Sequence, residues 1–216
     1  FMSIQNAINT VSDYDTILVS EGIYAENINY NGKNIVITGE NKETTIIDGG
    51  GQGSVVTFVN GEANSTILEN LTIQNGATNG DGGGINCMYA SPTLRNLIIQ
   101  NNSSNSDGGG ISCYFGSSPL VENVKILNNI AGWGGAFFCA EEESNPTLTN
   151  VLIAYNSGLN GAVCVWNDAN PTFKHITIAN NGIYDNELGL ESGFHNEFSN
   201  RVVTIRNSII WENENS

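Results

Sequence analysis

Asp81 and Asp107 each stand directly before a run of three glycines, 26 positions apart in the sequence. Two carboxylates held close together could hydrolyse a glycosidic bond, one as an acid and the other as a base or nucleophile. They could also bind a calcium ion, which prefers carboxylate oxygens. Asp side chains before glycine more commonly hydrogen-bond their own backbone and form turns. We therefore expect turn formation first, with a calcium site at Asp81 and Asp107 as the second interpretation.

A second group of residues combines aromatic rings with acids. Tyr114 and Trp166 each follow a short apolar run, at equivalent places in a repeated pattern, and could offer flat faces to sugar rings. Three acidic residues nearby in the sequence could hydrogen-bond a sugar or hold calcium, namely Glu142, Glu143 and Asp168. The alternative is that the aromatic rings only cover the protein surface while the acids face water. Trp133 and His195 lie in longer, irregular segments and receive no role.

One basic residue has neighbours that could support chemistry. β-Elimination of a uronate polysaccharide needs a Lys or Arg as base and a cation to neutralise the carboxylate. Arg95 occupies a repeated position at which Glu69 and Glu122 precede and follow it. The simpler interpretation is an exposed ladder of opposite charges, worth a few tenths of a kcal/mol per pair. Because no complete acid, base and nucleophile set is recognisable, the catalytic residues stay unassigned and the sequence favours a non-catalytic protein.

The four cysteines indicate packing rather than chemistry. Cys87, Cys113 and Cys139 recur at steps of 26 residues, whereas Cys164 is displaced by one residue. We expect the first three to stack in the interior as free thiols and Cys164 to face the opposite way. Zinc binding is not expected, because no C-x-x-C motif is present and the chain has 2 His.

Composition excludes some classes of protein. The 216-residue chain is 39% hydrophobic, so it can build a core, yet its net charge is -15 with 7 Lys plus Arg. Binding to nucleic acid is not expected without a basic surface. No stretch approaches the roughly 18 consecutive apolar residues of a transmembrane helix, and the first residues lack the features of a signal peptide. Membrane insertion is therefore not expected either.

These residues belong to a repeat that dictates the fold. One position recurs at steps of 26, 27, 27, 25 and 32 residues, and each period holds three short runs of β-forming residues separated by Gly, Asn, Ser and Pro. We predict that each period of about 26 residues forms one three-stranded coil of a right-handed parallel β-helix, with equivalent apolar residues stacked inside. Stacked side chains at the recurring position could hydrogen-bond along the axis. Its residues are Asn70, Asn96, Asn123, Asn150, His175 and Asn207.

The two ends of the chain differ from the middle. Residues 1–13 show a helical pattern with Ile4, Ala7, Ile8 and Val11 on one face, and this helix could cap the first coil. Residues 14–64 are expected to form irregular first coils, and residues 65–216 regular repeats of the same single domain. The last residues stop within a repeat phrase, so we expect a longer natural chain or an open strand edge that could associate with another copy.

Two phrases in the repeat carry a family resemblance. Segments such as "GGGI" at Gly82 and Gly108 and "GGAF" at Gly134 alternate with an I-x-x-N phrase, although Gly76 replaces the Asn in the first of these coils. The chain resembles the pectate-lyase-like superfamily of right-handed β-helix proteins over nearly its whole length. The paired phrases are similar to the GGAI and FxxN repeats of polymorphic outer-membrane proteins. This resemblance implies a secreted or surface location.

The resemblance does not by itself indicate catalysis. Hydrolases of this fold that resemble polygalacturonases use an Asp-Asp pair and a Gly-His-Gly segment, and this sequence has neither. We therefore expect a secreted or cell-surface β-helix scaffold or binding module, directed at a polysaccharide or surface glycan, with no cofactor other than calcium. The alternatives are a lyase or glycoside hydrolase acting on acidic polysaccharide, and an adhesin or filament subunit.

Overall fold

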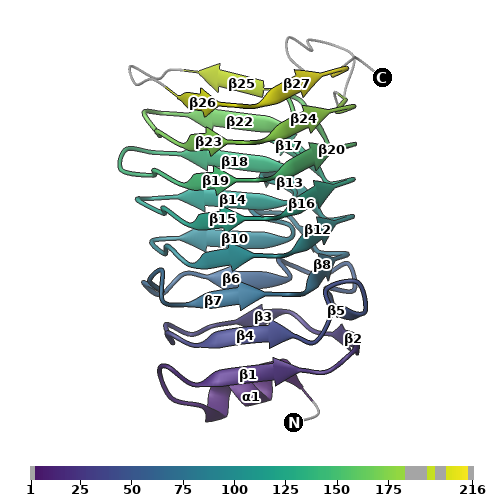
Figure 1. Ribbon diagram of the computed structural model, residues 1–216, viewed down its shortest axis with the longest axis vertical. Helices are drawn as coiled ribbons and strands as arrows, with labels where there is room; N and C mark the ends of the chain where they lie inside the picture. Colours follow the sequence, from purple (N-terminus) through teal and green to yellow (C-terminus); the bar gives the residue numbers. More distant parts are fainter. Residues whose placement is uncertain (1–2, 183–193, 198–202, 214–216) are drawn as a thin grey trace.

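The protein forms a right-handed parallel β-helix with one short helix at its N-terminal end, as the repeat predicts. A computed structural model describes residues 3–182, 194–197 and 203–213. Figure 1 shows the coils stacked along one axis, from α1 (Ile4–Thr10) at one end to β26 (Thr204–Arg206) and β27 (Ile209–Trp211) at the other. Within the described residues, no helix has the length and apolar character needed to cross a membrane.

Three long parallel sheets form the walls of the β-helix. The first sheet contains β1 (Thr16–Val19), β4 (Val36–Gly39), β7 (Ile67–Glu69), β11 (Thr93–Arg95), β15 (Leu120–Glu122), β19 (Thr147–Thr149), β23 (Thr172–Lys174) and β26. The second sheet contains β2 (Gly22–Ala25), β5 (Thr45–Asp48), β8 (Thr72–Gln74), β12 (Ile98–Gln100), β16 (Lys125–Leu127), β20 (Leu152–Ala154), β24 (Thr177–Ala179) and β27. The third sheet contains β3 (Ile28–Asn29), β6 (Val56–Phe58), β10 (Ile85–Met88), β14 (Ile111–Tyr114), β18 (Phe137–Ala140), β22 (Val163–Trp166) and β25 (Phe194–Glu197).

In the part of the chain that the structure describes, four coils carry an additional short strand that the sequence pattern did not indicate. These strands lie between the second and third sheets in chain order and pair with one another as a fourth sheet. They are β9 (Ala77–Thr78), β13 (Ser103–Asp107), β17 (Ile130–Trp133) and β21 (Ser157–Gly158). The pairing of β13 with β17 shifts register between Ser104 and Asp107, which places Asp107 opposite Trp133.

The core is a set of vertical ladders of identical or similar residues. Ile99 of β12 pairs in register with Ile73 before it and Ile126 after it, and all three are fully buried. The predicted thiol stack is confirmed, because Cys113 pairs with Cys87 and Cys139 and all are buried and free. Each fully buried aliphatic side chain contributes about 1.5–3 kcal/mol, so repetition of one inward position stabilises the whole stack.

Cys164 faces away from this stack, as predicted. It pairs with Phe138 rather than with Cys139, and these two residues belong to a second, smaller apolar cluster on the outer face of the third sheet. The outer face is therefore covered here rather than open to water.

The recurring polar position is fixed mainly by its backbone conformation. Asn70, Asn96, Asn123 and Asn150 have φ values between 53° and 58°, and His175 in the same place has φ 52°. Asn tolerates this left-handed conformation better than other residues with a β-carbon, which explains its recurrence at a sharp corner. A side-chain bond along the axis joins Asn150 Nδ2 to Asn123 Oδ1 at 2.6 Å.

The continuous asparagine ladder lies at a different position, the Asn of the I-x-x-N phrase. Asn102, Asn129, Asn156 and Asn181 are each no more than 1% exposed. The Oδ1 atom of Asn129 accepts from the backbone N and the Nδ2 of Asn102, both at 3.0 Å. Asn156 and Asn181 repeat this arrangement one and two coils further along. The phrase thus satisfies backbone donors inside each turn.

The asparagine ladder begins at Asn102 for a physical reason. A β-carbon placed on Gly76 would lie 2.0 Å from the carbonyl oxygen of Gly83, so no larger residue fits there. The backbone N of Gly76 still donates to Asn102 Oδ1 at 2.9 Å. Gly76 is therefore the end of the ladder rather than an irregularity in it.

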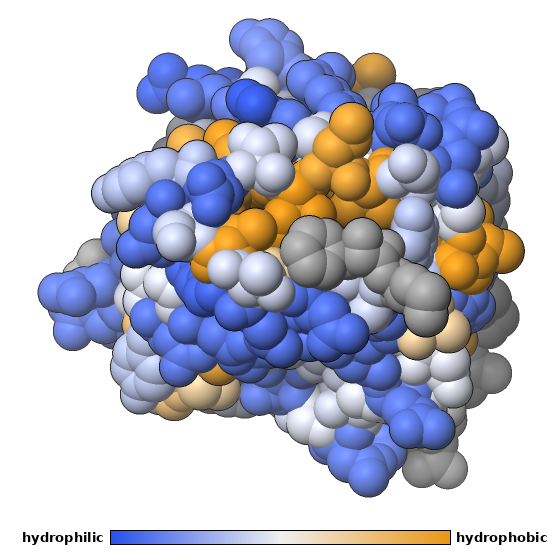
Figure 2. Space-filling model, turned by 90° about the horizontal axis from the view of Figure 1, so that it is seen from below, coloured by the Kyte–Doolittle hydropathy of each residue, from blue (hydrophilic) through white to orange (hydrophobic). Residues whose placement is uncertain are grey.

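The N-terminal helix caps the first coil as predicted. Ile4, Ala7 and Ile8 are buried against the apolar interior. The carboxylate of Glu26 accepts from the backbone N of Ile4 at 2.9 Å, while Lys33 Nζ donates to the carbonyl of Ile8 at 2.7 Å. These charges suit the positive and negative ends of the helix dipole. Seen from this end, an apolar patch lies among hydrophilic side chains (Figure 2).

The strands of residues 14–64 pair within the same three sheets as the later coils.

Candidate ligand-binding site

A hollow of about 500 Å³ lies on the outer face of the third sheet, beside the fourth sheet. Its volume is within the range of small-molecule sites. The described residues that line it are Asn105, Ser106, Asp107, Tyr114, Gly132, Trp133, Phe138, Ala140, Glu141, Leu159 and Trp166.

The register of the third sheet explains why this surface is hollow. Tyr114 ends β14, Ala140 ends β18, and Trp166 ends β22 directly opposite Ala140. A small residue therefore separates two large rings that lie two rungs, about 10 Å, apart along the axis. Gly132 of β17 leaves further space on the side of the fourth sheet.

Four aromatic rings form the walls of the hollow. The ring centroids of Trp133 and Trp166 are 4.1 Å apart, and those of Tyr114 and Phe138 are 5.3 Å apart. Phe138 is buried, whereas the other three rings are half-buried and reach the surface. Aromatic faces of this kind combine a large apolar area with polar edges, which suits ligands that have both apolar and hydroxylated surfaces.

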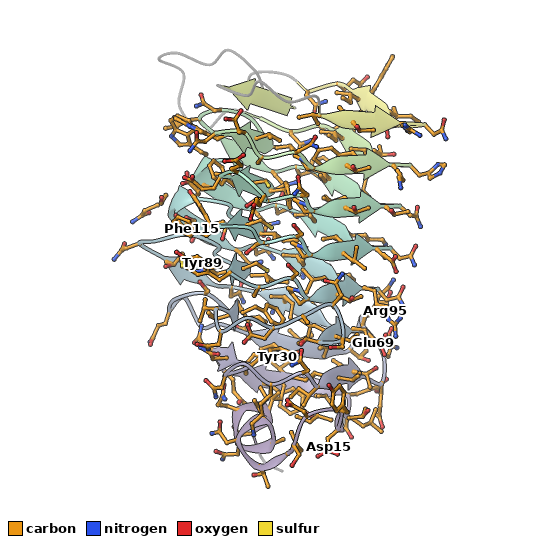
Figure 3. The ribbon with its side chains drawn as sticks, turned by 90° about the vertical axis from the view of Figure 1, so that its left-hand side faces the viewer. Asp15, Tyr30, Glu69, Tyr89, Arg95 and Phe115 are labelled. Atoms are coloured by element: carbon orange, nitrogen blue, oxygen red, sulfur yellow. The ribbon has the colours of Figure 1, made fainter. Side chains whose placement is uncertain are left out.

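The aromatic surface continues beyond the hollow onto a neighbouring corner of the coil. The Tyr114 ring lies 5.7 Å from Phe115, which stacks on Tyr89 of the previous coil with centroids 5.0 Å apart and an angle of 13°. Tyr89 and Phe115 are 61% and 42% exposed. Figure 3 shows these two rings together on one side of the molecule. We call Tyr89, Phe115, Tyr114 and Phe138 the aromatic run, and it extends along three successive coils.

A carboxylate lies inside the hollow and binds one of its rings. The Tyr114 hydroxyl donates to Asp107 Oδ2. Partial burial raises the pKa of Asp107, the negative charge of Asp81 raises it further, and the bond from Tyr114 opposes both effects. Burial, followed by the neighbouring Asp107, raises the pKa of Tyr114 far above its ordinary value. The phenol thus stays protonated at neutral pH and serves as a donor rather than as a base.

A second carboxylate stands at the rim. Glu141 follows β18 with φ 77° and accepts from Asn167 Nδ2 at 3.0 Å. No Lys or Arg is among the described residues that line the hollow. The site is therefore aromatic and acidic.

The structure brings together only some of the residues singled out from the sequence. Tyr114 and Trp166 share the hollow, and Asp107 joins them. The three predicted acids Glu142, Glu143 and Asp168 are not among its lining residues, although each follows a strand that contributes a ring or the separating alanine. The role of all of these residues in binding stays a prediction.

The proposed calcium site has a limited donor set. Asp81 lies close enough to influence Asp107 electrostatically, but one oxygen of Asp107 is already bound by Tyr114. The described part of the chain contains no group of three or more Asp, Glu, His or Cys side chains suited to a metal ion. Calcium binding by Asp81 and Asp107 stays a prediction.

Most of the described lining residues were not predicted from the sequence to belong to a site, including three large apolar side chains. Trp133 and Leu159 lie outside the three regular sheets, and Phe138 had no assigned role. The only signal for Trp133 was its presence in a segment that departs from the repeat.

Arg95 takes part in the charge ladder predicted for it. It forms an ion pair with Glu69 on the outer face of the first sheet and is in register with Glu122 on its other side. Figure 3 shows the pair on the side of the view opposite Tyr89 and Phe115. This arginine is therefore not part of the aromatic hollow.

No protein-family model matches the chain, and no curated protein does either. Two solved structures are similar to it. One is a crystal structure of pectin methylesterase in complex with a hexasaccharide, at 11% identity and TM-score 0.47, covering 82% of this chain and 66% of that one. The other is pectin methylesterase from carrot, at 10% identity and TM-score 0.43, covering 99% of this chain and 79% of that one. The chain thus spans slightly less than two thirds of the first structure, and no residue role follows from either likeness.

Proposed function

We propose that this protein is a non-catalytic binding module that holds a glycan chain along the aromatic run and in the adjoining hollow. The observation that carries the proposal is the continuity of rings across three coils, from the exposed Tyr89 to the half-buried Tyr114 and on to Phe138. A long, partly exposed row of rings suits successive units of a polymer better than one compact ligand.

The partners of the polar groups support binding rather than catalysis. Tyr114 is held by Asp107, and Glu141 is held by Asn167, so both described acids of the hollow already orient neighbouring side chains. A raised pKa also removes Tyr114 as a base or nucleophile near neutral pH. A lyase or hydrolase acting on acidic polysaccharide remains the alternative, and it predicts release of unsaturated or reducing ends from a polymer.

We further propose a secreted or cell-surface location. The outer surface gains its polarity from Asn, Ser, Thr and Gly, since only 13% of the residues are charged. The narrower resemblance to polymorphic outer-membrane proteins stays a prediction and would place the module on a bacterial surface.

Self-association is a second candidate function. Ile210 of β27 occupies the inward position at which Ile178 is fully buried, yet Ile210 is 49% exposed. An exposed inward residue favours the addition of another strand to the second sheet. Sedimentation over a range of concentrations tests this, and a monomer at every concentration would contradict it.

The binding proposal is tested with polysaccharide affinity electrophoresis and tryptophan fluorescence. Tyr89→Asn removes one ring from the aromatic run while keeping a residue that tolerates its φ of 56°. Loss of one stacking contact of about 1 kcal/mol should weaken binding roughly fivefold. Tyr155→Asn is the matched control, because Tyr155 is 62% exposed with φ 59° but follows the second sheet. Equal effects of the two substitutions would contradict the proposal.

A second variant tests the hollow itself. Ala140→Leu places a larger side chain between the Tyr114 and Trp166 rungs. It should weaken glycan binding at least tenfold while the circular dichroism spectrum stays that of the wild type. Unchanged binding by a folded Ala140→Leu protein would show that the ligand does not enter the hollow.

A further inference from the structure

The charges around the hollow restrict which glycan it can accept. Asp107 lies inside and Glu141 stands at the rim, while Asp81 is near enough to raise the pKa of Asp107. A glycan rich in carboxylates would bring further negative charge to these groups. Its binding would require a compensating cation.

The described basic residues cannot supply that cation. Lys33 binds the C-terminal carbonyls of α1, and Lys42 lies in the loop between β4 and β5. The other four described Lys and Arg residues lie on the first or second sheet and are Arg95, Lys125, Lys174 and Arg206. The third and fourth sheets, which form the hollow, carry no Lys or Arg among the described residues, and the described histidine of the third sheet is His195 of β25, in register with Cys164. Uronate polymers are therefore poorly matched to this surface.

A positively charged ligand matches both features of the hollow. The face of an aromatic ring attracts an ammonium group, by about 0.5–1 kcal/mol at exposed sites and about 2 kcal/mol where water is excluded. A half-buried carboxylate is unfavourable without a partner of opposite charge, and the described hydrogen-bond donors to Asp107 are neutral, namely the phenol of Tyr114 and the adjacent Ser106. An ammonium group beside Asp107 would offset this penalty, whereas a neutral sugar hydroxyl would do so less well.

We propose that the hollow binds a cationic amino-sugar polymer, with the ammonium group of one unit held between the aromatic rings and the carboxylates of Asp107 and Glu141. This inference rests on the proposed glycan-binding function and adds the charge of the ligand to it. Neighbouring sugar units would stack on Phe115 and Tyr89, which continue the aromatic run without further acids among the rings.

The proposal is tested by titrating the protein with four probes and following tryptophan fluorescence below the pKa of the sugar amines. The probes are a glucosamine oligomer, the same oligomer fully N-acetylated, an oligogalacturonate and choline. We expect the glucosamine oligomer to bind at least tenfold more tightly than its neutral N-acetylated form. The oligogalacturonate should not bind, and added salt should weaken binding of the cationic oligomer.

Variants identify the carboxylates responsible. Asp107→Asn can still accept from Tyr114, and Glu141→Gln keeps the length of the side chain. Each should reduce the preference for the glucosamine oligomer three- to tenfold. Glu122→Gln makes the same change of charge on the exposed face of the first sheet and should leave the preference unchanged. An equal loss in all three variants would overturn the proposal, because it would indicate only an effect of net charge.

The outcomes separate this inference from the proposed function. Equal binding of the two oligomers, with Tyr89→Asn still harmful, would refute the cationic ligand but leave glycan binding intact. Tight binding of choline without binding of any oligomer would refute both the amino-sugar polymer and the glycan function. Failure of all four probes to bind would also refute both. Folding of each variant is checked by circular dichroism.

Discussion

Replacing Asn129 by alanine would remove the middle of the buried asparagine ladder. In the wild type, Asn129 Oδ1 accepts from the N and Nδ2 of Asn102, and Asn129 Nδ2 donates to the Ile99 carbonyl and to Asn156 Oδ1, all at 3.0 Å. Asn129 itself is 0% exposed, so water cannot replace these bonds without opening the coil. The substitution therefore leaves polar groups of two neighbouring coils without their partner.

The expected loss of stability follows from the polar groups that lose a hydrogen-bond partner. The backbone N of Asn102 loses its acceptor, and an unsatisfied buried group costs about 1–3 kcal/mol. The other three bonds contribute about 0.5–1 kcal/mol each, because the Nδ2 of Asn102 keeps the Ile73 carbonyl as a second partner. The free energy of unfolding should thus fall by about 2.5–6 kcal/mol, a large part of the 5–15 kcal/mol typical of a domain.

Chemical unfolding followed by circular dichroism measures this loss. Asn64→Ala is the control, since Asn64 is exposed and no side-chain hydrogen bond is described for it, and it should change stability by less than about 0.5 kcal/mol. Asn129→Asp adds a test of sign. Burial would raise the folded-state pKa of the new carboxyl, so its stability would be highest at low pH and lost as the pH rises through that pKa. A loss below about 1 kcal/mol for Asn129→Ala would refute the view that the ladder holds successive coils together.

Three further substitutions test other parts of the structure. Asp107→Asn should raise the unfolding temperature at pH 7 by a few degrees but not at pH 3, because a raised folded-state pKa makes the wild-type carboxyl unfavourable as the pH rises through it; thermal unfolding at both values checks the sign. Lys33→Met should cost about 1–2 kcal/mol by freeing three carbonyls at the end of α1, and hydrogen exchange should show the loss within that helix. Gly76→Ala should cost about 3 kcal/mol or prevent folding, since its β-carbon would overlap the Gly83 carbonyl; a soluble variant with wild-type stability would contradict this geometry.

The fold could be predicted from the sequence because residues that stack in the core recur at regular intervals along the chain. Ile99 has the same residue one coil before and one coil after it, and the structure pairs Ile73, Ile99 and Ile126 directly. The one-residue displacement of Cys164 likewise predicted that it faces away from Cys139, because successive residues of a strand point to opposite faces. In a parallel β-helix, residues that stack on successive coils are thus separated by a nearly constant number of residues in the sequence.

The roles of the asparagines could not be separated in this way. Asn123 and Asn129 recur with the same period, yet the first stands at an exposed left-handed corner and the second is buried in a hydrogen-bonded ladder. The repeat shows only that a given residue type is required at a given position of the coil. Whether the requirement comes from φ or from hydrogen bonds depends on the turn geometry, which the repeat does not contain.

Only part of the candidate site could be predicted from the sequence, for a related reason. Tyr114 and Trp166 lie in regular strands, so their equivalence could be read from the repeat. Trp133 comes from the fourth sheet, whose short strands of two to five residues show no clear alternation and include a shift of register. Asp107 lies in the same sheet, and its recurrence with Asp81 did not indicate that it would meet the aromatic rings. That shift brings Asp107 opposite Trp133. Such irregularities leave no periodic signal, although they decide which side chains meet.

The difference between inward and outward positions explains why the hollow is on the third sheet. Inward positions must repeat because every coil packs on the next, so they cannot vary enough to form a site. Outward positions on the first sheet carry solvated charges such as Arg95 and Glu69. On the third sheet the outer face is flanked by the fourth sheet, and this shelter lets Phe138 become buried and Asp107 partly desolvated. A partly desolvated carboxylate is stabilised more by a nearby cation than by the little water that reaches it. The irregular fourth sheet, which shields Asp107 from water, thus favours the positive charge proposed for the ligand.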